Sequence, residues 1–335
     1  SRACPELVSA DIHRTSFHNL IGGVDPVTNA EFVHYEWACG GNGGFLEADG
    51  PSAMAAIDWG DLTTVQPTEV LESRFPLHIE WTQLGLDSGG PGERRGGLGM
   101  RRALRLTRGT AAYSLLSDGA IMPPFGVHGG ETGAPVDSYV INADETEHRF
   151  ASPGKVGGHP LTEGDTVILQ SAAGGGYGDP LRRDPEEVHR DVENDLVSQE
   201  IAETIYGVRF DNDGTIDIEG TASHRTALSA ARPRLRAISD ENDPYVASGP
   251  SRRRTIRLHP ADLAAHDLAP DQKIELLDEV GAPLRGWVVS DDTVVQGTTP
   301  LDGLGLRLLG VEAGAEVYIR PLYTPVVEYR TAPVT

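Results

Sequence analysis

Short apolar runs separated by glycine pairs dominate residues 75–141. The runs read LHIEW, RALRL, AYSLL and SYVI, and each has the length of one strand. Repeated short strands with turn residues between them are typical of all-β structure. Residues 31–39 (EFVHYEWAC) alternate in polarity and are rich in aromatic side chains, so they predict a further strand that ends at the glycine run 40–44. Upstream, residues 22–26 (GGVDP) predict a turn.

Helix signals gather between residues 184 and 206. Asp184 is suited to cap a helix, Pro185 fits the first helical position, and Glu187 is placed to complete a capping box. Ser198 is suited to cap a second helix. The spacing therefore predicts a helical pair over about 184–206.

The pattern changes after residue 210. The next stretch is polar and contains turn clusters, which is typical of a linker, with one short helix predicted around residues 222–238. Candidate strands then recur at 254–258, 273–277, 286–289 and 315–320. The predicted fold class is α+β, mostly β. The predicted parts are a core with a helical pair (1–210), a linker (211–250) and a small β-rich accessory domain (251–335).

Composition places the chain among globular proteins. It has 335 residues, of which 39% are hydrophobic, and it contains no apolar run of the roughly 18 residues that a membrane span needs. The N-terminal sequence lacks the charged and apolar regions of a signal peptide. Cys4 and Cys39 are the only cysteines, so a disulfide framework is excluded and a reducing, cytoplasmic setting is expected.

The charge balance disfavours nucleic acid as a partner. Fifty acidic residues stand against 28 basic ones, for a formal net charge of −22. A phosphate-binding surface needs clustered Lys and Arg, and this chain has only two lysines, Lys155 and Lys273.

Several self-contained chemical motifs are missing from the sequence. It has no Walker-type phosphate loop, no Gly-x-Ser-x-Gly elbow, and no Cys-x-x-Cys or His-x-x-x-His pair. The glycine run 174–178 is separated from the next predicted helix, which favours a tight turn between layers over a phosphate cradle.

Glu36 is an acidic residue on an otherwise apolar, aromatic strand. Because strand side chains alternate, His34 and Glu36 share one face, and Tyr35 and Trp37 share the other. A His/Glu pair can bind a metal or relay protons if it is buried. The alternative is that this face is solvent-exposed.

Other polar residues lie in predicted loops. His18 and Asn19 are adjacent, Asp61 follows Trp59 and Gly60, and His128 precedes two glycines. Each is a weak signal alone, and a loop histidine is more often simply exposed.

Read together, several segments resemble the hydantoinase B/oxoprolinase family. They occur in the family's order across about residues 5–210. The segments are 18–20 (HNL), 22–26 (GGVDP), 34–36 (HYE), 69–76 (EVLESRFP), 88–97 (SGGPGERRGG), 124–130 (PFGVHGG), 153–155 (PGK), 164–165 (GD), 174–180 (GGGYGDP) and 206–208 (YGV).

The resemblance implies a large, mostly β architecture and a second, hydantoinase A-like subunit that uses ATP. It implies one of two activities, namely ATP-dependent hydrolysis of cyclic amides or ATP-dependent carboxylation of ketones such as acetone or acetophenone. In both, phosphorylation of an oxygen activates the substrate, and a divalent metal (Mn, Zn or Fe) assists.

The sequence also departs from the family pattern. The family's N-terminal polar motifs are missing, and the metal ligands are expected in that half. The chain is therefore expected to be one of two chains of a split subunit, or a processed piece. Residues 57–61 (IDWGD) replace the His-rich segment of 5-oxoprolinase-like members, which argues against 5-oxoproline as substrate.

The resulting hypothesis is a subunit of an ATP-dependent amidohydrolase that acts on a hydantoin or lactam. Its expected partners are an ATP/Mg-binding hydantoinase A-like subunit and a separate hydantoinase B-like N-terminal half. The second of these is expected to supply most of the ligands of the divalent metal. A ketone carboxylase subunit and a non-catalytic assembly subunit are the alternatives. The candidate site residues are Glu36 as general acid/base, His18 and His128 for polarisation or metal contact, and Asn19 and Asp61 beside them.

Overall fold

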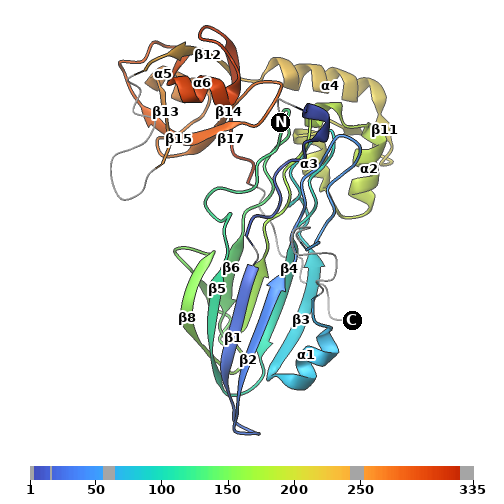
Figure 1. Cartoon of the computed structure of the whole chain (residues 1–335). Coiled ribbons are helices and arrows are strands. Elements are labelled where there is room, and N and C mark those ends of the chain that lie inside the picture. The colour runs from blue at the N-terminus through green and yellow to red at the C-terminus, as the bar shows by residue number, and fades with distance from the viewer. Residues whose placement is uncertain (1–3, 16, 56–64, 242–252, 325–335) are drawn as a thin grey trace.

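The computed structural model describes residues 4–15, 17–55, 65–241 and 253–324. Along its long direction, two packed sheets form one end, and a layer of glycine-rich loops joins them to a helical cluster and a C-terminal sheet at the other end (Figure 1). Strands predominate over helices, so the prediction of a mostly β, α+β chain is confirmed. None of the helices in these ranges has the length and apolar character needed to cross a bilayer.

The first sheet has four antiparallel strands in the order β2-β1-β5-β8. Their bounds are β1 Phe17–Asp25, β2 Ala30–Ala38, β5 Thr110–Leu116 and β8 Lys155–Thr162. The second sheet has five antiparallel strands in the order β3-β4-β9-β6-β7. Their bounds are β3 Leu77–Leu84, β4 Met100–Leu106, β6 Asp137–Ile141, β7 Glu147–Arg149 and β9 Thr166–Gln170, and helix α1 (Thr68–Arg74) precedes β3.

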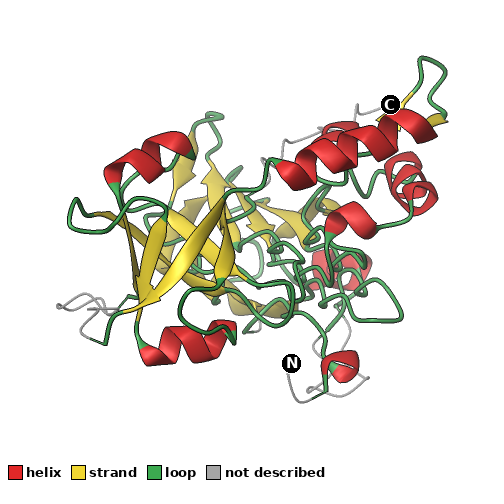
Figure 2. Cartoon of the chain, turned by 90° about the horizontal axis from the view of Figure 1, so that it is seen from above, coloured by secondary structure: helices red, strands yellow, loops and turns green. Residues whose placement is uncertain are grey.

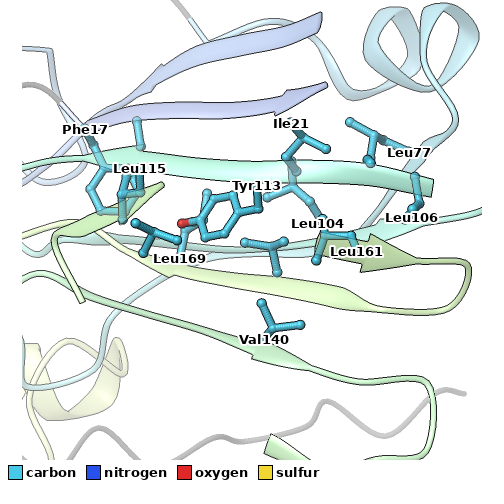
Figure 3. Packing of buried hydrophobic residues seen from close by; sticks show 14 of the residues in the cluster. Phe17, Ile21, Leu77, Leu104, Leu106, Tyr113, Leu115, Val140, Leu161 and Leu169 are labelled. Carbon is cyan, nitrogen blue, oxygen red and sulfur yellow. The ribbon is translucent and has the colours of Figure 1, made fainter. Parts of the chain in front are cut away.

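The two sheets enclose one apolar core. Ile21 and Tyr113 of the first sheet pack towards Leu104, Val140 and Leu169 of the second, and all five side chains are buried (Figure 3). Each fully buried aliphatic side chain contributes about 1.5–3 kcal/mol relative to an exposed one. Alternation along the strands places these residues inwards, so local sequence pattern and long-range packing agree.

Strand β1 includes most of the residues at which a turn is predicted. The predicted turn at 22–26 is wrong for residues 22–25, which lie inside β1, and the chain turns only from Pro26 onwards. A side chain at Gly23 would place its Cβ 2.4 Å from the carbonyl oxygen of Thr110 on β5. Gly23 therefore serves close strand approach rather than a turn.

Four glycine-rich segments lie against one another above the sheets and together form what we call the glycine layer. They are residues 40–44, 89–97, 126–133 and 174–178. Gly44 donates its amide to Gly175, Gly90 to Gly174, and Gly97 to Asn42, at 2.9, 2.9 and 2.7 Å. The run 174–178 forms no hydrogen-bonded turn, and Tyr177 within it pairs with Arg94 and Val127 as isolated bridges, so the interpretation as a tight turn is wrong. A Cβ at Gly174 would lie 1.8 Å from the carbonyl oxygen of Asn42, which explains why glycine is needed in this glycine layer.

The predicted helical pair is confirmed. Helix α2 (Pro185–Glu193) follows η3 (Pro180–Arg182), and the Asp184 side chain accepts from the amide of Glu186. In α3 (Gln199–Thr204), the Ser198 side chain accepts from the amide of Ile201. The predicted capping box is wrong, because the carboxylate of Glu187 contacts Arg94 and Arg183 instead.

The stretch predicted as a linker holds regular structure. A small hairpin of β10 (Arg209–Phe210) and β11 (Ile216–Asp217) precedes α4 (Ile218–Ala230), the helix expected around 222–238. Residues 234–238 of that expected helix instead lie in strand β12 (Arg234–Ser239), which pairs with two strands of the C-terminal sheet.

That sheet has six strands in the order β13-β15-β14-β17-β12-β16. Beyond β12, the bounds are β13 Thr255–Leu258, β14 Lys273–Leu277, β15 Leu284–Ser290, β16 Thr298–Leu301 and β17 Glu316–Pro321, and the helices are α5 Pro260–Ala265 and α6 Gly303–Leu309. β13 and β16 also approach each other, so the sheet curls towards closure around its own apolar core. Seen from above, it lies beside α4 (Figure 2).

Candidate functional site

A buried polar cluster forms around Glu36 on β2. Asn19 on β1 is its register partner and donates from Nδ2 to Glu36 Oε1 at 3.2 Å. Arg102 on β4, in the opposite sheet, donates from Nη1 to Glu36 Oε2 at 2.7 Å. The His34 Nε2 atom lies 3.6 Å from the same oxygen. One carboxylate thus connects both sheets.

The faces of β2 follow the predicted alternation. His34 and Glu36 share the inner face, and Glu36 is only 6% exposed. The alternative of a solvent-exposed His/Glu face is therefore wrong. Tyr35 and Trp37 lie on the outer face and are exposed.

The electrostatics favour an ionised Glu36. Burial raises the pKa of its carboxyl group, but His34, the charge of Arg102 and the Asn19 amide outweigh burial and hold the pKa below its ordinary value. Burial, together with the Glu36 charge, raises the pKa of the nearby Cys39 thiol. Glu36 is consequently suited to accept hydrogen bonds as an ionised carboxylate, whereas its lowered pKa makes it a poor proton donor and only a weak base.

The cluster keeps unused hydrogen-bonding capacity. His34 Nδ1, Asn19 Oδ1 and Arg102 Nε are buried and have no hydrogen-bond partner in the part of the chain that the structure describes. Buried polar atoms are almost always paired, so such a group of exceptions marks a place where a further polar ligand or water fits.

His18 and Asn19 point in opposite directions, because they are consecutive on β1. The His18 Nδ1 atom lies 2.5 Å from the Tyr35 hydroxyl, and its ring stacks on Tyr35 and meets Trp37 edge-on. The structure therefore does not bring His18 to Glu36. Asp61 lies outside the described residues.

His128 contacts residues that do not belong to the Glu36 cluster. It lies in the glycine layer with a left-handed φ of 53°, its amide donates to Gly281, and its Nδ1 accepts from the Gly281 amide at 3.1 Å. Its ring meets Tyr177. His128 thus connects the glycine layer with the loop between β14 and β15, and it is half-buried rather than an exposed loop residue.

Sequence reasoning missed Arg102, the strongest partner of Glu36. Arg101 and Arg102 are both fully buried on a strand whose other residues are mostly apolar. Two arginines in the middle of such a strand are the signal that could have revealed them, because buried arginines require partners.

A second buried network supports the glycine layer. Arg183 binds both carboxylate oxygens of Asp49, at 2.6 and 2.7 Å, and also reaches Asp191 at 2.9 Å. Arg95 binds Asp191 at 3.2 Å. Through Asp191, these pairs attach α2 to the loops that contain Asp49 and Arg95.

No metal-binding cluster is present in residues 4–15, 17–55, 65–241 and 253–324, where no three His, Cys, Asp or Glu side chains are placed to hold an ion together. Glu36 is already paired with a cation, which disfavours a metal ion there. The glycine-layer amides described above bond to other backbone carbonyls, so they are not available to hold a phosphate.

Comparison with known proteins agrees with this architecture. A family model described as hydantoinase B/oxoprolinase matches residues 1–180. The caprolactamase subunit beta of Pseudomonas jessenii is 32% identical over 235 residues, which cover 68% of this chain and 39% of that one. The crystal structure of the ATP-dependent caprolactamase from the same organism superposes with a TM-score of 0.58 at 31% identity, covering 67% of this chain and 39% of that one.

A carboxylase is also similar. The acetone carboxylase alpha subunit of Xanthobacter autotrophicus is 27% identical over 264 residues, covering 68% of this chain and 34% of that one. The chain spans about a third of the length of the curated relatives it matches, between 28% and 39% for the first three.

Proposed function

The chain belongs to the hydantoinase B/oxoprolinase family, and on that premise we propose that it is part of the B-type subunit of an ATP-dependent amidohydrolase. Its substrate would be a cyclic amide such as a lactam or hydantoin. Hydrolysis adds water across the amide C–N bond and leaves, on one molecule, a carboxylate with an amine from a lactam or with a ureido group from a hydantoin. The rest of the B-type length and a hydantoinase A-like, ATP-binding subunit would act beside it.

The observation that carries this proposal is the graded similarity. Identity to the caprolactamase subunit is 32%, against 27% for the acetone carboxylase subunit over a similar share of the chain. Amide hydrolysis is therefore favoured over ketone carboxylation, which remains the second candidate because a carboxylase is among the relatives.

Among the described residues, no three potential ligands meet and the glycine-layer amides bond to backbone carbonyls, which supports placing the metal and the nucleotide elsewhere. We therefore assign both to the partner chains. Within this chain, Glu36 would hold a fixed negative charge that accepts a proton or a hydrogen bond at the reacting amide or water. Asn19 and Arg102 would keep its carboxylate in place.

The test begins with native mass spectrometry of the complex purified from its source. Co-purification of an A-type ATP-binding chain supports the proposal, and a chain found alone contradicts it. The purified complex is then assayed for ATP-dependent opening of lactams and hydantoins. Turnover that requires bicarbonate would establish the carboxylase instead, and activity in a complex lacking this chain would make it an assembly subunit.

A matched pair of variants tests the site. Glu36→Gln removes the buried charge, and Glu31→Gln removes an exposed one from the same strand. We expect the first to lower turnover by at least about a hundredfold, the range for a lost acid/base group, and the second to leave it unchanged. Full turnover of a folded Glu36→Gln complex would exclude the assigned role.

A further inference from the structure

A cavity of about 720 Å³ lies where three parts of the chain meet. Its walls come from the glycine layer and η3, from α4, and from the β14 and β17 ends of the C-terminal sheet. Figure 1 shows α4 and this sheet next to each other above the sandwich. The volume is in the range of small-molecule sites. The cavity is lined by none of the Glu36 cluster residues, although the candidate residue His128 is part of its wall.

Most of the charges in the cavity neutralise one another. Arg232 binds both carboxylate oxygens of Asp179 at 2.6 Å, and Arg320 binds Glu131 at 2.7 Å. Arg234 reaches Glu316 at 3.5 Å. These pairs need no ligand.

Two arginines remain on the side formed by η3 and α4. Arg225 donates to the carbonyl oxygens of Tyr206 and Arg183 at 2.9 and 2.8 Å, but it makes no ion pair in the described part of the chain. Burial lowers the pKa of its guanidinium, and the charges of Asp179 and Asp184 offset the lost hydration only in part. Arg182 likewise makes no ion pair with any described residue.

Two acidic residues remain on the wall formed by the chain that follows β14. Asp278 and Glu279 follow the end of β14, line the cavity, and make no ion pair within the described residues. Leu181, Leu277 and Ile319 line the same space. The cavity therefore combines a cationic wall, an acidic wall and apolar surface.

We propose that this cavity binds an ω-amino acid, with its carboxylate at Arg182 and Arg225, its ammonium group at Asp278 and Glu279, and its methylene chain on the apolar surface. Both ends of such a ligand form charge-assisted hydrogen bonds, and the intervening chain is desolvated. The assignment rests on the proposed function for its biological meaning, since opening a lactam ring yields this class of molecule. The cavity would be a product-type site distinct from the Glu36 cluster.

Binding is measured by isothermal titration calorimetry on the full chain, without ATP, partner or turnover. The probes are 6-aminohexanoate, hexanoate and 1-aminohexane, which carry both charges, only the negative charge, or only the positive charge. We expect 6-aminohexanoate to bind at least about tenfold more tightly than either single-charge probe, because each lost charged contact weakens binding by about that factor or more.

Two substitutions with matched controls locate the ligand. Glu279→Gln should weaken 6-aminohexanoate at least about tenfold and leave hexanoate unchanged, whereas Glu312→Gln, an exposed change outside the cavity, should alter neither. Arg182→Gln should weaken both carboxylate probes, and Arg307→Gln on α6 should not. Glu279 and Arg182 line the cavity, whereas the control residues Glu312 and Arg307 do not.

Three results would overturn the inference. They are no saturable binding of 6-aminohexanoate, equal affinity for hexanoate, or equal effects of a lining variant and its control. Binding by a complex that opens no lactam would contradict the proposed function alone, and lactam opening by a chain that binds no probe would contradict this inference alone.

Discussion

Arg320, on the last strand of the C-terminal sheet, donates to Glu131 of the glycine layer at 2.7 Å. The same guanidinium binds Glu275 at 2.8 Å and the carbonyl oxygens of Gly129 and Gly130. One half-buried arginine thus joins two parts of the chain that are 189 residues apart in sequence. The charge state of Glu131 is therefore coupled to the packing of these two parts.

The first prediction concerns the pH dependence of stability. Burial raises the pKa of Glu131 to about 7, against the opposing charge of Arg320. The folded chain therefore holds this proton after the unfolded chain has lost it, so Glu131 should lower the free energy of unfolding as pH rises from about 4.5 to about 7. Glu131→Gln should remove this contribution, as measured by urea unfolding across that interval. An unchanged pH profile would contradict it, and exposed Glu147→Gln is the control.

Loss of the Glu36 charge should destabilise the sandwich. Glu36→Gln leaves Arg102 buried without a counter-ion, which costs about 3–5 kcal/mol when a buried pair is broken. Because the pKa of Glu36 is lowered, its contribution is present above the ordinary glutamate pKa and is lost as pH falls through the folded value. Denaturant titration should show the deficit at neutral pH, and Glu31→Gln should stay within about 0.5 kcal/mol of the parent. Equal midpoints for the two variants would refute this reading of the cluster.

The free energy of unfolding should depend as strongly on the Arg183 network as on Glu36. Arg183→Met removes the cation shared by Asp49 and Asp191 and leaves two carboxylates close together. We expect a loss of about 3–5 kcal/mol in the free energy of unfolding. The neighbouring Arg182→Met changes an exposed side chain that makes no ion pair with any residue the structure describes, and it should have little effect. A tolerated Arg183→Met substitution would show that hydrophobic packing compensates for the network.

A methyl group at Gly174 should destabilise the glycine layer. Gly174→Ala would place a Cβ 1.8 Å from the carbonyl oxygen of Asn42, and backbone on both sides must then move. We expect a loss of at least about 1–3 kcal/mol, with reduced soluble yield. Gly157→Ala on β8 meets nothing within 4 Å and is the matched control. Thermal unfolding of both variants decides the point, and a shift that is no larger for Gly174→Ala would contradict close backbone packing.

The part of the fold that depends on local pattern could be predicted from the sequence. Alternation along residues 31–39 correctly placed His34 and Glu36 on one face, and caps at Asp184 and Ser198 correctly marked two helices. The strands predicted near 273–277 and 315–320 are present as β14 and β17. Side-chain periodicity and capping act over a few residues, so they can be recognised in one short window.

The tertiary structure alone decided which of these residues meet. Arg102 reaches Glu36 across 66 positions, and His18 is directed away from it although its neighbour Asn19 is a direct partner. β12 joins the C-terminal sheet through pairing with β16 and β17, which no local signal marks. Sheet pairing and buried ion pairs depend on which distant strands pack together, and a single sequence specifies that only through the folding of the whole chain.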